Sequence, residues 1–499
     1  MKKWILTVLA AATGYGSGAQ VVHIPDASFK TCLLENRNIN LNGDDEIQVD
    51  EAEVFTGSID CSGKGIEDLT GIEHFENLFS LRCDSNQLTS LDLSNNLRLA
   101  SLRCMYNQLT HLNIGNNTDL SVLVCRHNPL ITLDVRNNTK LLTLDCSESS
   151  LSTLDIKSLT WLNTLECTGN QLTTLDVSRN VFLQRLFCSG NQLENLNLFS
   201  NVFLATLNCG ANRIASLDVG ANSELTSLSA YRNSLTNINV SSNARLAFLS
   251  VFENSLTEID VSGNPDLIQL SCGDNQLMNI DLSSNPKLES LSCHNNSLTS
   301  LNTAQNSGLR RLYCFFNALE NMDLTHNTLL QELSCFDNQL TNLDLSMCRE
   351  LEILSCYSNK MRTLNVKNGQ NSRLWLFSAF NNEDLHCIEV DDAEYSRTSW
   401  TFVDAGTHFS EECGVLTSLS DPQPAREFVV YPNPARDLLT IEGEESFVSY
   451  QLLDPTGRVT DSGQLAGNSI NISQINPGAY TLVLHTVKGN SKKTLVNVQ

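Results

Sequence analysis

Residues 81–95 read LRCDSNQLTSLDLSN, and the same pattern returns as LRCMYNQLTHLNIGN at 102–116 and as LVCRHNPLITLDVRN at 123–137. The copies begin at Leu81, Leu102 and Leu123, so the spacing between them is constant. A strict period of about 21 residues is typical of a solenoid, in which every repeat is one structural unit that contacts only its neighbours. The quoted stretch therefore predicts a stack of short coils.

The third residue of the stretch, which we call the cysteine position, marks the period. It is occupied by Cys83, Cys104, Cys125, Cys146, Cys167, Cys188, Cys209, Ala230, Val251, Cys272, Cys293, Cys314, Cys335 and Cys356. Because alanine and valine also serve there, we expect a small apolar plug in the core, as buried free cysteine behaves like a small hydrophobe. Disulfides and metal ligation are the alternatives. Parallel Cβ vectors disfavour the first, and a linear ladder lacks the tetrahedral convergence needed for the second.

The residues around the cysteine position predict a short strand followed by a bend. Leu-x-Cys alternates with a period of two, so one face of the strand points into the core. Stacked coils place such strands side by side as a parallel sheet. The asparagine three residues later, as in Asn86, can turn inward and hydrogen-bond the backbone of adjacent coils. About ten residues then remain before the next strand, too few for a long helix, so we expect a mainly β solenoid with little helix.

The repeat L-x-x-L-x-C-x-x-N-x-L resembles the leucine-rich repeat family over residues 77–384. The resemblance implies a concave sheet whose exposed strand residues bind partners. The column after the cysteine position begins with Asp84, which we expect to point outward, and becomes aromatic later. The predicted face comprises Tyr231, Phe252, Tyr313, Phe315, Phe316, Phe336, Tyr357 and Phe380, with a separate positive region at Arg82, Arg103 and Arg126. The alternative is that the rings pack on one another as a stabilising stripe.

The N-terminus and the overall charge predict an exported protein. MKKWILTVLAAATGYGSGAQ has two lysines, an apolar run and small residues before Gln20, so residues 1–19 are expected to be a signal peptide. No later apolar stretch is long enough to span a bilayer. A formal charge of −24 argues against a nucleic-acid partner, because neutralising phosphates requires a basic face.

Residues 20–76 are predicted to cap the first coil and to contain a loop of the EF-hand kind. Its oxygen donors at loop positions 1, 3, 5, 7 and 12 are Asn40, Asn42, Asp44, Glu46 and Glu51. Oxygens at this spacing can surround calcium, which makes calcium the one candidate cofactor. Asp45 stands where the family has glycine, and a solvated acidic turn is the competing interpretation.

Residues 385–415 lose the repeat and resemble the C-terminal cap of exported leucine-rich repeat proteins of Bacteroidetes-type bacteria. Trp400 and Phe402 are expected to cover the last coil. In an exported protein, cysteines in the caps pair readily. We therefore expect two disulfides, one joining Cys387 to Cys413 and the other joining Cys32 to Cys61.

After a linker at 416–428, residues 429–499 read as alternating strands with turn residues between them, which predicts a small immunoglobulin-like β-sandwich. The segment resembles the C-terminal sorting domain of the type IX secretion system. The residues that match its motifs are Tyr431, Pro432, Asn433, Pro434, Gly457, Pro477, Gly478 and Tyr480. The resemblance implies transport across the outer membrane, removal of the domain, and attachment to the cell surface or release.

The sequence shows no nucleotide-binding loop, zinc-binding H-E-x-x-H or nucleophile elbow, so we expect no enzyme. His127 and His294 directly follow strands and are expected to be solvated. The predicted function is non-catalytic binding or adhesion through the concave face, with a protein or glycan partner from a host or matrix. The alternative is a structural surface-layer spacer without a specific ligand. The secretion machinery is the other expected partner.

Overall fold

The computed structural model describes residues 20–413 and, towards the C-terminus, 428–431, 433, 435–443, 447–454, 458–465, 467–486 and 491–498. The predicted signal peptide and residues 414–427, which hold most of the predicted linker, lie outside these ranges. The chain divides into two compact units, Met1–Leu309 and Arg310–Gln499.

The first unit begins with a helical cap. Helix α1 (Ala27–Leu34) is capped by Asp26, whose Oδ1 accepts the Phe29 N–H at 2.9 Å. Helix α2 (Val49–Val54) starts with a capping box formed by Gln48 and Glu51. A 3₁₀ turn, η1 (Ile72–His74), leads into the coils. The cap buries Phe29 fully, so that the end of the first coil is closed by apolar side chains.

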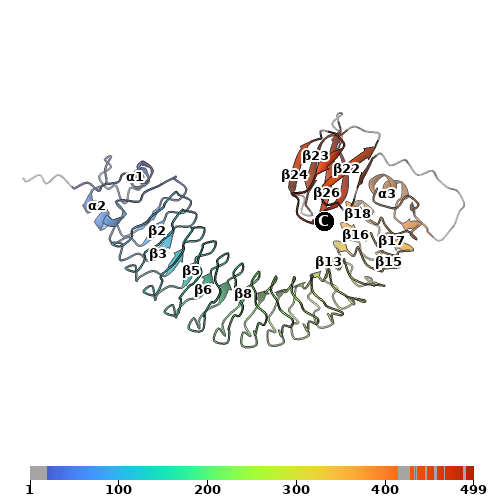
Figure 1. Cartoon of the computed structure of the whole chain (residues 1–499), viewed down its shortest axis with the longest axis horizontal. Coiled ribbons are helices and arrows are strands. Elements are labelled where there is room, and N and C mark those ends of the chain that lie inside the picture. Colours follow the sequence, from blue (N-terminus) through green and yellow to red (C-terminus); the bar gives the residue numbers. More distant parts are fainter. Residues whose placement is uncertain are drawn as a thin grey trace, which may run out of the picture. The chain divides into compact units, whose positions relative to one another are not determined.

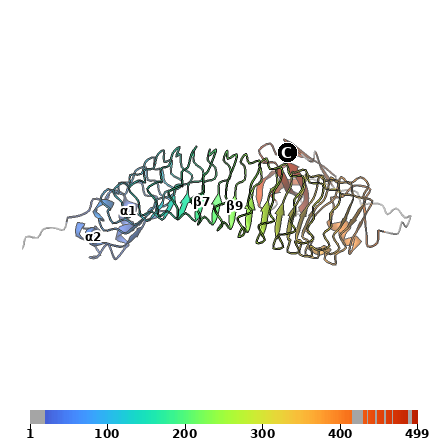
Figure 2. The ribbon, with the colours of Figure 1, turned by 90° about the horizontal axis from the view of Figure 1, so that it is seen from below.

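Three-residue strands then recur once per coil and pair in parallel, in chain order and in one register, as Leu81 opposite Leu102 and Leu102 opposite Leu123 show. In Figure 1, β2, β3, β5, β6 and β8 follow one another in this order, and Figure 2 shows β7 and β9 from below. The strands of this unit are β1 (Ser58–Asp60), β2 (Ser80–Arg82), β3 (Ser101–Arg103), β4 (Val122–Val124), β5 (Thr143–Asp145), β6 (Thr164–Glu166), β7 (Arg185–Phe187), β8 (Thr206–Asn208), β9 (Ser227–Ser229), β10 (Phe248–Ser250), β11 (Gln269–Ser271) and β12 (Ser290–Ser292).

The second unit continues the repeat with two parallel sheets, one on each side of the coil. The first contains β13 (Arg311–Tyr313), β14 (Glu332–Ser334), β16 (Ile353–Ser355) and β18 (Leu376–Ser378). The second contains β15 (Asn342–Asp344), β17 (Thr363–Asn365), β19 (Cys387–Glu389) and β20 (His408–Ser410), with η2 (Asn371–Arg373) and α3 (Ala393–Ser399) in the connections. In this end cap Trp400 is buried and stacks on Phe377 at 4.4 Å.

The C-terminal segment of the second unit folds into two antiparallel sheets. One contains β21 (Phe428–Tyr431), β22 (Leu438–Gly443) and β25 (Ser469–Asn471), and the other β23 (Phe447–Leu453), β24 (Val459–Gln464), β26 (Gly478–Thr486) and β27 (Ser491–Val498). Both sheets contribute to one apolar cluster that includes Leu439, Ile470, Leu452 and Leu482. The predicted fold class, a mainly β solenoid with little helix and a small antiparallel β domain after it, is confirmed.

Two ladders of asparagine hold the coils together. In the first, which the sequence predicted, Asn107 Nδ2 donates to the carbonyls of Cys83 and Cys104 at 2.9 and 3.1 Å, and its Oδ1 accepts the Leu88 N–H. The second ladder, eight residues before the cysteine position, was not predicted. There Asn222, which is fully buried, donates to two carbonyls of the preceding coil. Both ladders satisfy carbonyls at corners that no strand pairing reaches.

The cysteines of the ladder are buried thiols. Burial raises the pKa of Cys209 and Cys272 to about 12, because the low-dielectric interior disfavours the thiolate. The structure joins Cys387 to Cys413, with the two Cα atoms 5.8 Å apart. It does not join the other expected pair. Cys32 is a thiol that donates to the Asp60 carbonyl, and Cys61 donates to the Arg82 carbonyl, so each sulfur has a backbone acceptor.

Candidate functional site

The column of residues after the cysteine position follows the short strand of each coil, and where it is aromatic its rings stack on one another. In the first unit the rings of Tyr231 and Phe252 are 5.0 Å apart and within 3° of parallel. Both side chains are half-buried. The packing that sequence analysis offered as the alternative to binding is thus present, and it leaves a fraction of each ring in solvent.

Glycines in the preceding coil make room for these rings. A Cβ atom added to Gly210 would lie 2.3 Å from Cε1 of Tyr231, and one added to Gly273 would lie 2.4 Å from Cε1 of His294. The rings therefore lean over the backbone of the coil before their own. In the sequence, each of these glycines stands in the column one period before a ring, Gly210 before Tyr231 and Gly273 before His294.

The aromatic column is longer in the second unit. Phe315, Phe336, Tyr357 and Phe380 stack with centroid distances of 4.4, 4.4 and 4.7 Å. Tyr357 is buried, and its hydroxyl accepts a hydrogen bond from Asn497 Nδ2 of β27 at 2.8 Å, whereas the other three are half-buried. Phe316 meets two of these rings edge to face and is 49% exposed. It is therefore the most accessible ring of the predicted face.

Tyr313 lies on β13 beside this column, and its hydroxyl donates to Glu332 of β14. Burial and the neighbouring carboxylate raise the pKa of Tyr313 well above its usual value, so the phenol is a neutral donor at physiological pH. This side chain is half-buried and its hydrogen bond fixes its position in the sheet.

A polar hollow of about 570 Å³ lies in the second unit, formed by residues that follow the aromatic column in three consecutive coils. Its lining includes Asp337, Gln339, Ser358, Lys360 and Arg362. Burial raises the pKa of the Asp337 carboxyl. Sequence reasoning stopped at the column itself and missed this surface, whose residues occupy the second to sixth places after the cysteine position.

The arginine region at the other end is not a free positive surface. Arg82 pairs with Asp60 at 3.2 Å and approaches Asp84 at 3.6 Å. Arg126 lies 3.7 Å from Asp145 and 5.7 Å from the centroid of the Tyr106 ring. These pairs balance the charges that the sequence alone suggested would be unopposed.

Arg103 and Asp84 carry the two unsatisfied polar atoms of this region. The Nε of Arg103 and the Oδ2 of Asp84 are buried without a hydrogen-bond partner in the described part of the chain. Asp84 was expected to point outward, but it is only 3% exposed, and its Oδ1 accepts the Met105 N–H. This hydrogen bond holds the side chain against the next coil instead of leaving it in solvent.

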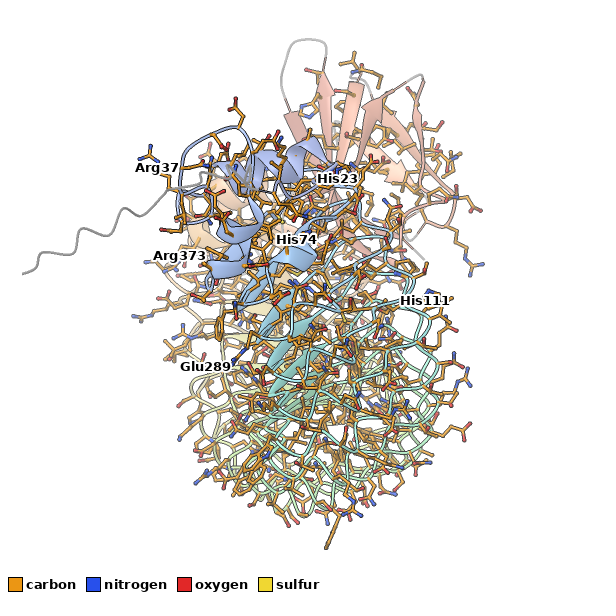
Figure 3. The ribbon with its side chains drawn as sticks, turned by 90° about the vertical axis from the view of Figure 1, so that its left-hand side faces the viewer. His23, Arg37, His74, His111, Glu289 and Arg373 are labelled. Carbon is orange, nitrogen blue, oxygen red and sulfur yellow. A yellow bond between two sulfur atoms is a disulfide. The ribbon has the colours of Figure 1, made fainter. Side chains whose placement is uncertain are left out.

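The two histidines expected to be solvated are half-buried instead. His127 stacks on Tyr106 at 4.3 Å. His294 bridges Ser292, at 2.8 Å from Nδ1, and Asp274, at 3.0 Å from Nε2. Figure 3 marks three further histidines, His23, His74 and His111, which come from the cap, from η1 and from a later coil. Within the described ranges, no group of three or more His, Cys, Asp or Glu side chains could hold a metal ion.

The predicted calcium loop is closed by its own hydrogen bonds. Glu51 accepts the N–H groups of Leu41, Asn42 and Gln48 at 2.8–3.1 Å. The Asp44 carboxylate accepts from the Glu46 backbone N–H and from the side chain of Gln48. Side chains at loop positions 1, 3, 5 and 12 thus organise the turn, while Glu46 pairs with Lys30 at 2.7 Å. Calcium binding here stays a prediction.

Part of the predicted sorting motif lies in the described ranges. Asn433 Oδ1 accepts the Asn497 N–H of β27 at 2.7 Å, which ties the start of the domain to its last strand. Tyr480 is buried and its hydroxyl donates to the Asn476 carbonyl, beside Pro477 and Gly478. Tyr431 ends β21 and is 45% exposed. Pro432, Pro434 and Gly457 lie outside the described residues.

Residues 429–499 match the family model of the secretion system C-terminal sorting domain. A comparison with curated proteins finds no match. None of the described helices has the length and apolar character of a membrane span.

Solved structures resemble the solenoid. The functional domain of InlJ from Listeria monocytogenes, which includes a cysteine ladder, is 26% identical with a TM-score of 0.62, and the match covers 96% of this chain and 98% of that one. A leucine-rich repeat protein of Leptospira interrogans is 28% identical with a TM-score of 0.51, over 54% of this chain and 74% of that one.

A plant structure shares the fold alone. It is the leucine-rich repeat ectodomain of the receptor kinase GASSHO1/SCHENGEN3 from Arabidopsis thaliana, in complex with CASPARIAN STRIP INTEGRITY FACTOR 2. The identity is 23% and the TM-score 0.51, over 66% of this chain and 47% of that one.

Proposed function

We propose a non-catalytic recognition function for this chain, an exported leucine-rich repeat protein that ends in a type IX secretion sorting domain. The sorting domain directs the protein to the cell surface or the extracellular space through the type IX secretion machinery. At that location the aromatic column of the solenoid would bind a protein or a glycan of a host or matrix. The plant ectodomain, solved in complex with another protein, is an example of binding by this fold.

The observation that supports this function is the aromatic column of the second unit together with Phe316, the accessible ring that packs edge to face on it. Phe316 is 49% exposed, and Phe315, Phe336 and Phe380 are half-buried beside a hollow lined by amide, carboxylate and basic side chains. Aromatic rings with one accessible edge, next to convergent polar groups, are the usual composition of a recognition surface. A surface that served only as a spacer would gain nothing from exposing such rings to water.

The experiment replaces Phe316 with serine, alone and with Phe380→Ser. Serine is compatible with the backbone at 316, whose φ is 50°, because Ser358 holds the equivalent place in another coil with φ 52°. The purified variants are measured by biolayer interferometry against a panel of immobilised matrix proteins and glycans. We expect at least about tenfold weaker binding, with a lowered melting temperature that still leaves the variants folded at the assay temperature.

Trp375→Ser is the matched control, since Trp375 is 62% exposed in the same unit but lies outside the aromatic column. It should bind as the parent does. If the parent binds and Phe316→Ser with Phe380→Ser binds equally well, the aromatic column is not the recognition surface. If the parent binds no member of the panel, the spacer function is favoured, and the ring stack is then explained by its contribution to stability.

A further inference from the structure

A row of side chains six residues before the cysteine position, which we call the flank row, runs along the first unit at the turn before each strand. In chain order it contains Arg98, Asp119, Lys140, Trp161, Phe182, Phe203, Glu224, Arg245, Asp266 and Lys287. Successive members lie on adjacent coils. Over most of its length the row is a ladder of ion pairs, formed by Asp119 with Lys140, Glu224 with Arg245, and Asp266 with Lys287. In the second unit the same position holds Arg373, which Figure 3 marks and which pairs with Glu350.

The centre of the row departs from this pattern. Trp161, Phe182 and Phe203 stack at 5.0 and 6.3 Å, within 2° and 12° of parallel. They are 58%, 41% and 50% exposed. The neighbouring Phe199 and Val202 are exposed as well. Three consecutive coils thus present large apolar side chains to solvent where the coils on both sides present charges. Such a patch on an otherwise polar flank marks an interaction surface.

Residues at equal distances on the two sides of the patch carry opposite charges. Counting outward from Phe182, Lys140 lies as far from the centre as Glu224, Asp119 as far as Arg245, and Arg98 as far as Asp266. Each pair has opposite sign, and Trp161 is equivalent to Phe203. From Arg98 to Asp266, a surface with this order fits a copy of itself related by a two-fold axis, because each charge in this range then meets its opposite and the rings meet rings.

We propose that a second copy of this chain docks on the flank row, antiparallel to the first, with the two-fold axis through Phe182. Coils are about 4.8 Å apart, so the row from Arg98 to Asp266 spans roughly 38 Å along the interface. The central rings would supply the apolar contact, and the charges on either side would fix the register. The interface uses coils of the first unit, whereas the proposed recognition surface lies in the second unit, so pairing and recognition involve different residues.

The first test measures the mass of the purified full-length protein by sedimentation equilibrium, from nanomolar concentrations to about 100 µM. The proposal expects a monomer–dimer equilibrium, and about tenfold or greater weakening by Phe182→Asp. Met278→Asp is the control, because Met278 is 65% exposed on the same unit but away from the flank row. A parent that stays monomeric overturns the proposal, and so does a Phe182→Asp variant that dimerises like the parent.

The second test exchanges charges. Lys140→Glu should weaken the dimer, because the introduced glutamate would face Glu224 of the second copy, and adding Glu224→Lys should restore it. Within one chain the double variant retains both unfavourable neighbours, a glutamate beside Asp119 and a lysine beside Arg245. Restoration therefore reports on contact between copies, not on repair inside the coil. The antiparallel register would be overturned if the double variant had the same melting temperature as Lys140→Glu and dimerised as weakly as that single variant.

The third test locates the axis by cross-linking. Val181 lies next to Phe182 and is 39% exposed, so the two copies of Val181→Cys should form an intermolecular disulfide on mild oxidation. Thr139→Cys, two coils away, should not, since its two copies would be separated by roughly four coil spacings of about 4.8 Å. Ladder thiols do not interfere because they are buried. Equal cross-linking of the two variants would overturn the placement of the axis.

Discussion

At the scale of single residues, the coils depend on side chains that satisfy backbone groups at the corners. Asn222 donates from Nδ2 to the carbonyls of Leu198 and Asn201 at 3.1 and 2.8 Å, and the same arrangement recurs in most coils, with Leu159 in this place in one of them. At one corner Cys348 takes this place, with its sulfur 3.8 Å from the Asn327 carbonyl oxygen. A thiol is a weak donor, so the second ladder tolerates at least one weak member.

We predict that Asn222→Ala destabilises the solenoid by about 1–3 kcal/mol, because two buried carbonyls lose their donor. Asn222→Cys should cost less than Asn222→Ala, as a thiol can still donate weakly. Urea unfolding followed by circular dichroism gives the free energies, with the exposed neighbour Ser223→Ala as the control. Equal stability of Asn222→Ala and the parent would show that the ladder does not contribute.

At the scale of elements, strands of three residues are too short to be stable alone, and they form because the coil before and the coil after both pair with them. The ends of the stack therefore need other elements. Helices α1 and α2 and η1 close one end. At the other end, α3 and the Cys387–Cys413 disulfide follow the last coils, and Trp400 donates from Nε1 to the Leu374 carbonyl.

The N-terminal cap should depend strongly on Glu51. This carboxylate is 6% exposed and accepts three backbone N–H groups, so Glu51→Ala leaves three donors without their acceptor. We expect a loss of about 2–4 kcal/mol for the cap, measured by hydrogen exchange at residues 40–54. Unchanged exchange rates in this segment would contradict the prediction.

Calcium titration of the same two proteins tests the predicted metal site. If the loop also holds calcium, adding the ion raises the melting temperature of the parent but not that of Glu51→Ala, since a ligand that binds only the folded state stabilises it. A chelator-treated sample serves as the reference. Identical melting curves of the parent with calcium and with chelator would show that calcium does not bind this loop.

At the scale of the whole molecule, the cysteine ladder makes stability depend on alkaline pH. Burial raises the pKa of Cys209, Cys272 and Cys335 to about 12, from 9.0 in the unfolded chain. Because the folded pKa is the higher one, the contribution is complete below pH 9 and is lost as the pH rises from 9 toward 12.

The melting temperature should therefore fall steeply above about pH 9, through many thiols at once. Native ladder thiols should also resist alkylation by iodoacetamide at about pH 8 until the chain unfolds, as the thiolate is the reactive form. A series in which Cys209 and Cys272 are replaced by valine, the residue found at Val251, should show a shallower decline. A decline independent of the number of ladder cysteines would contradict the linkage.

Export is a property of the whole chain that the last domain controls. Deleting residues 429–499 should leave the protein in the periplasm, because the sorting domain is the part that the secretion machinery recognises. Fractionation of cells with an antibody to the solenoid measures this. Phe182→Asp, which alters only the solenoid surface, should still be exported.

The repeat, the column of small core residues, the inward asparagine and the sorting domain could all be predicted from the sequence. A constant period makes each position equivalent to the one in the next coil, so the spacing alone assigns residues to columns. The same spacing contains the flank row and the second asparagine ladder, but they lie six and eight residues before the cysteine position, outside the strand and the bend that the predicted pattern describes.

What only the tertiary structure decided is how deep each side chain lies and which neighbour it meets. Asp84 is covered, Arg82 is paired with Asp60, and His294 joins Ser292 to Asp274. The tilt of Tyr231 over Gly210 depends on the size of a residue in another coil. A column fixes which residues are adjacent along the stack, whereas burial and pairing result from the packing of neighbouring columns, and a single repeat carries no information on that packing.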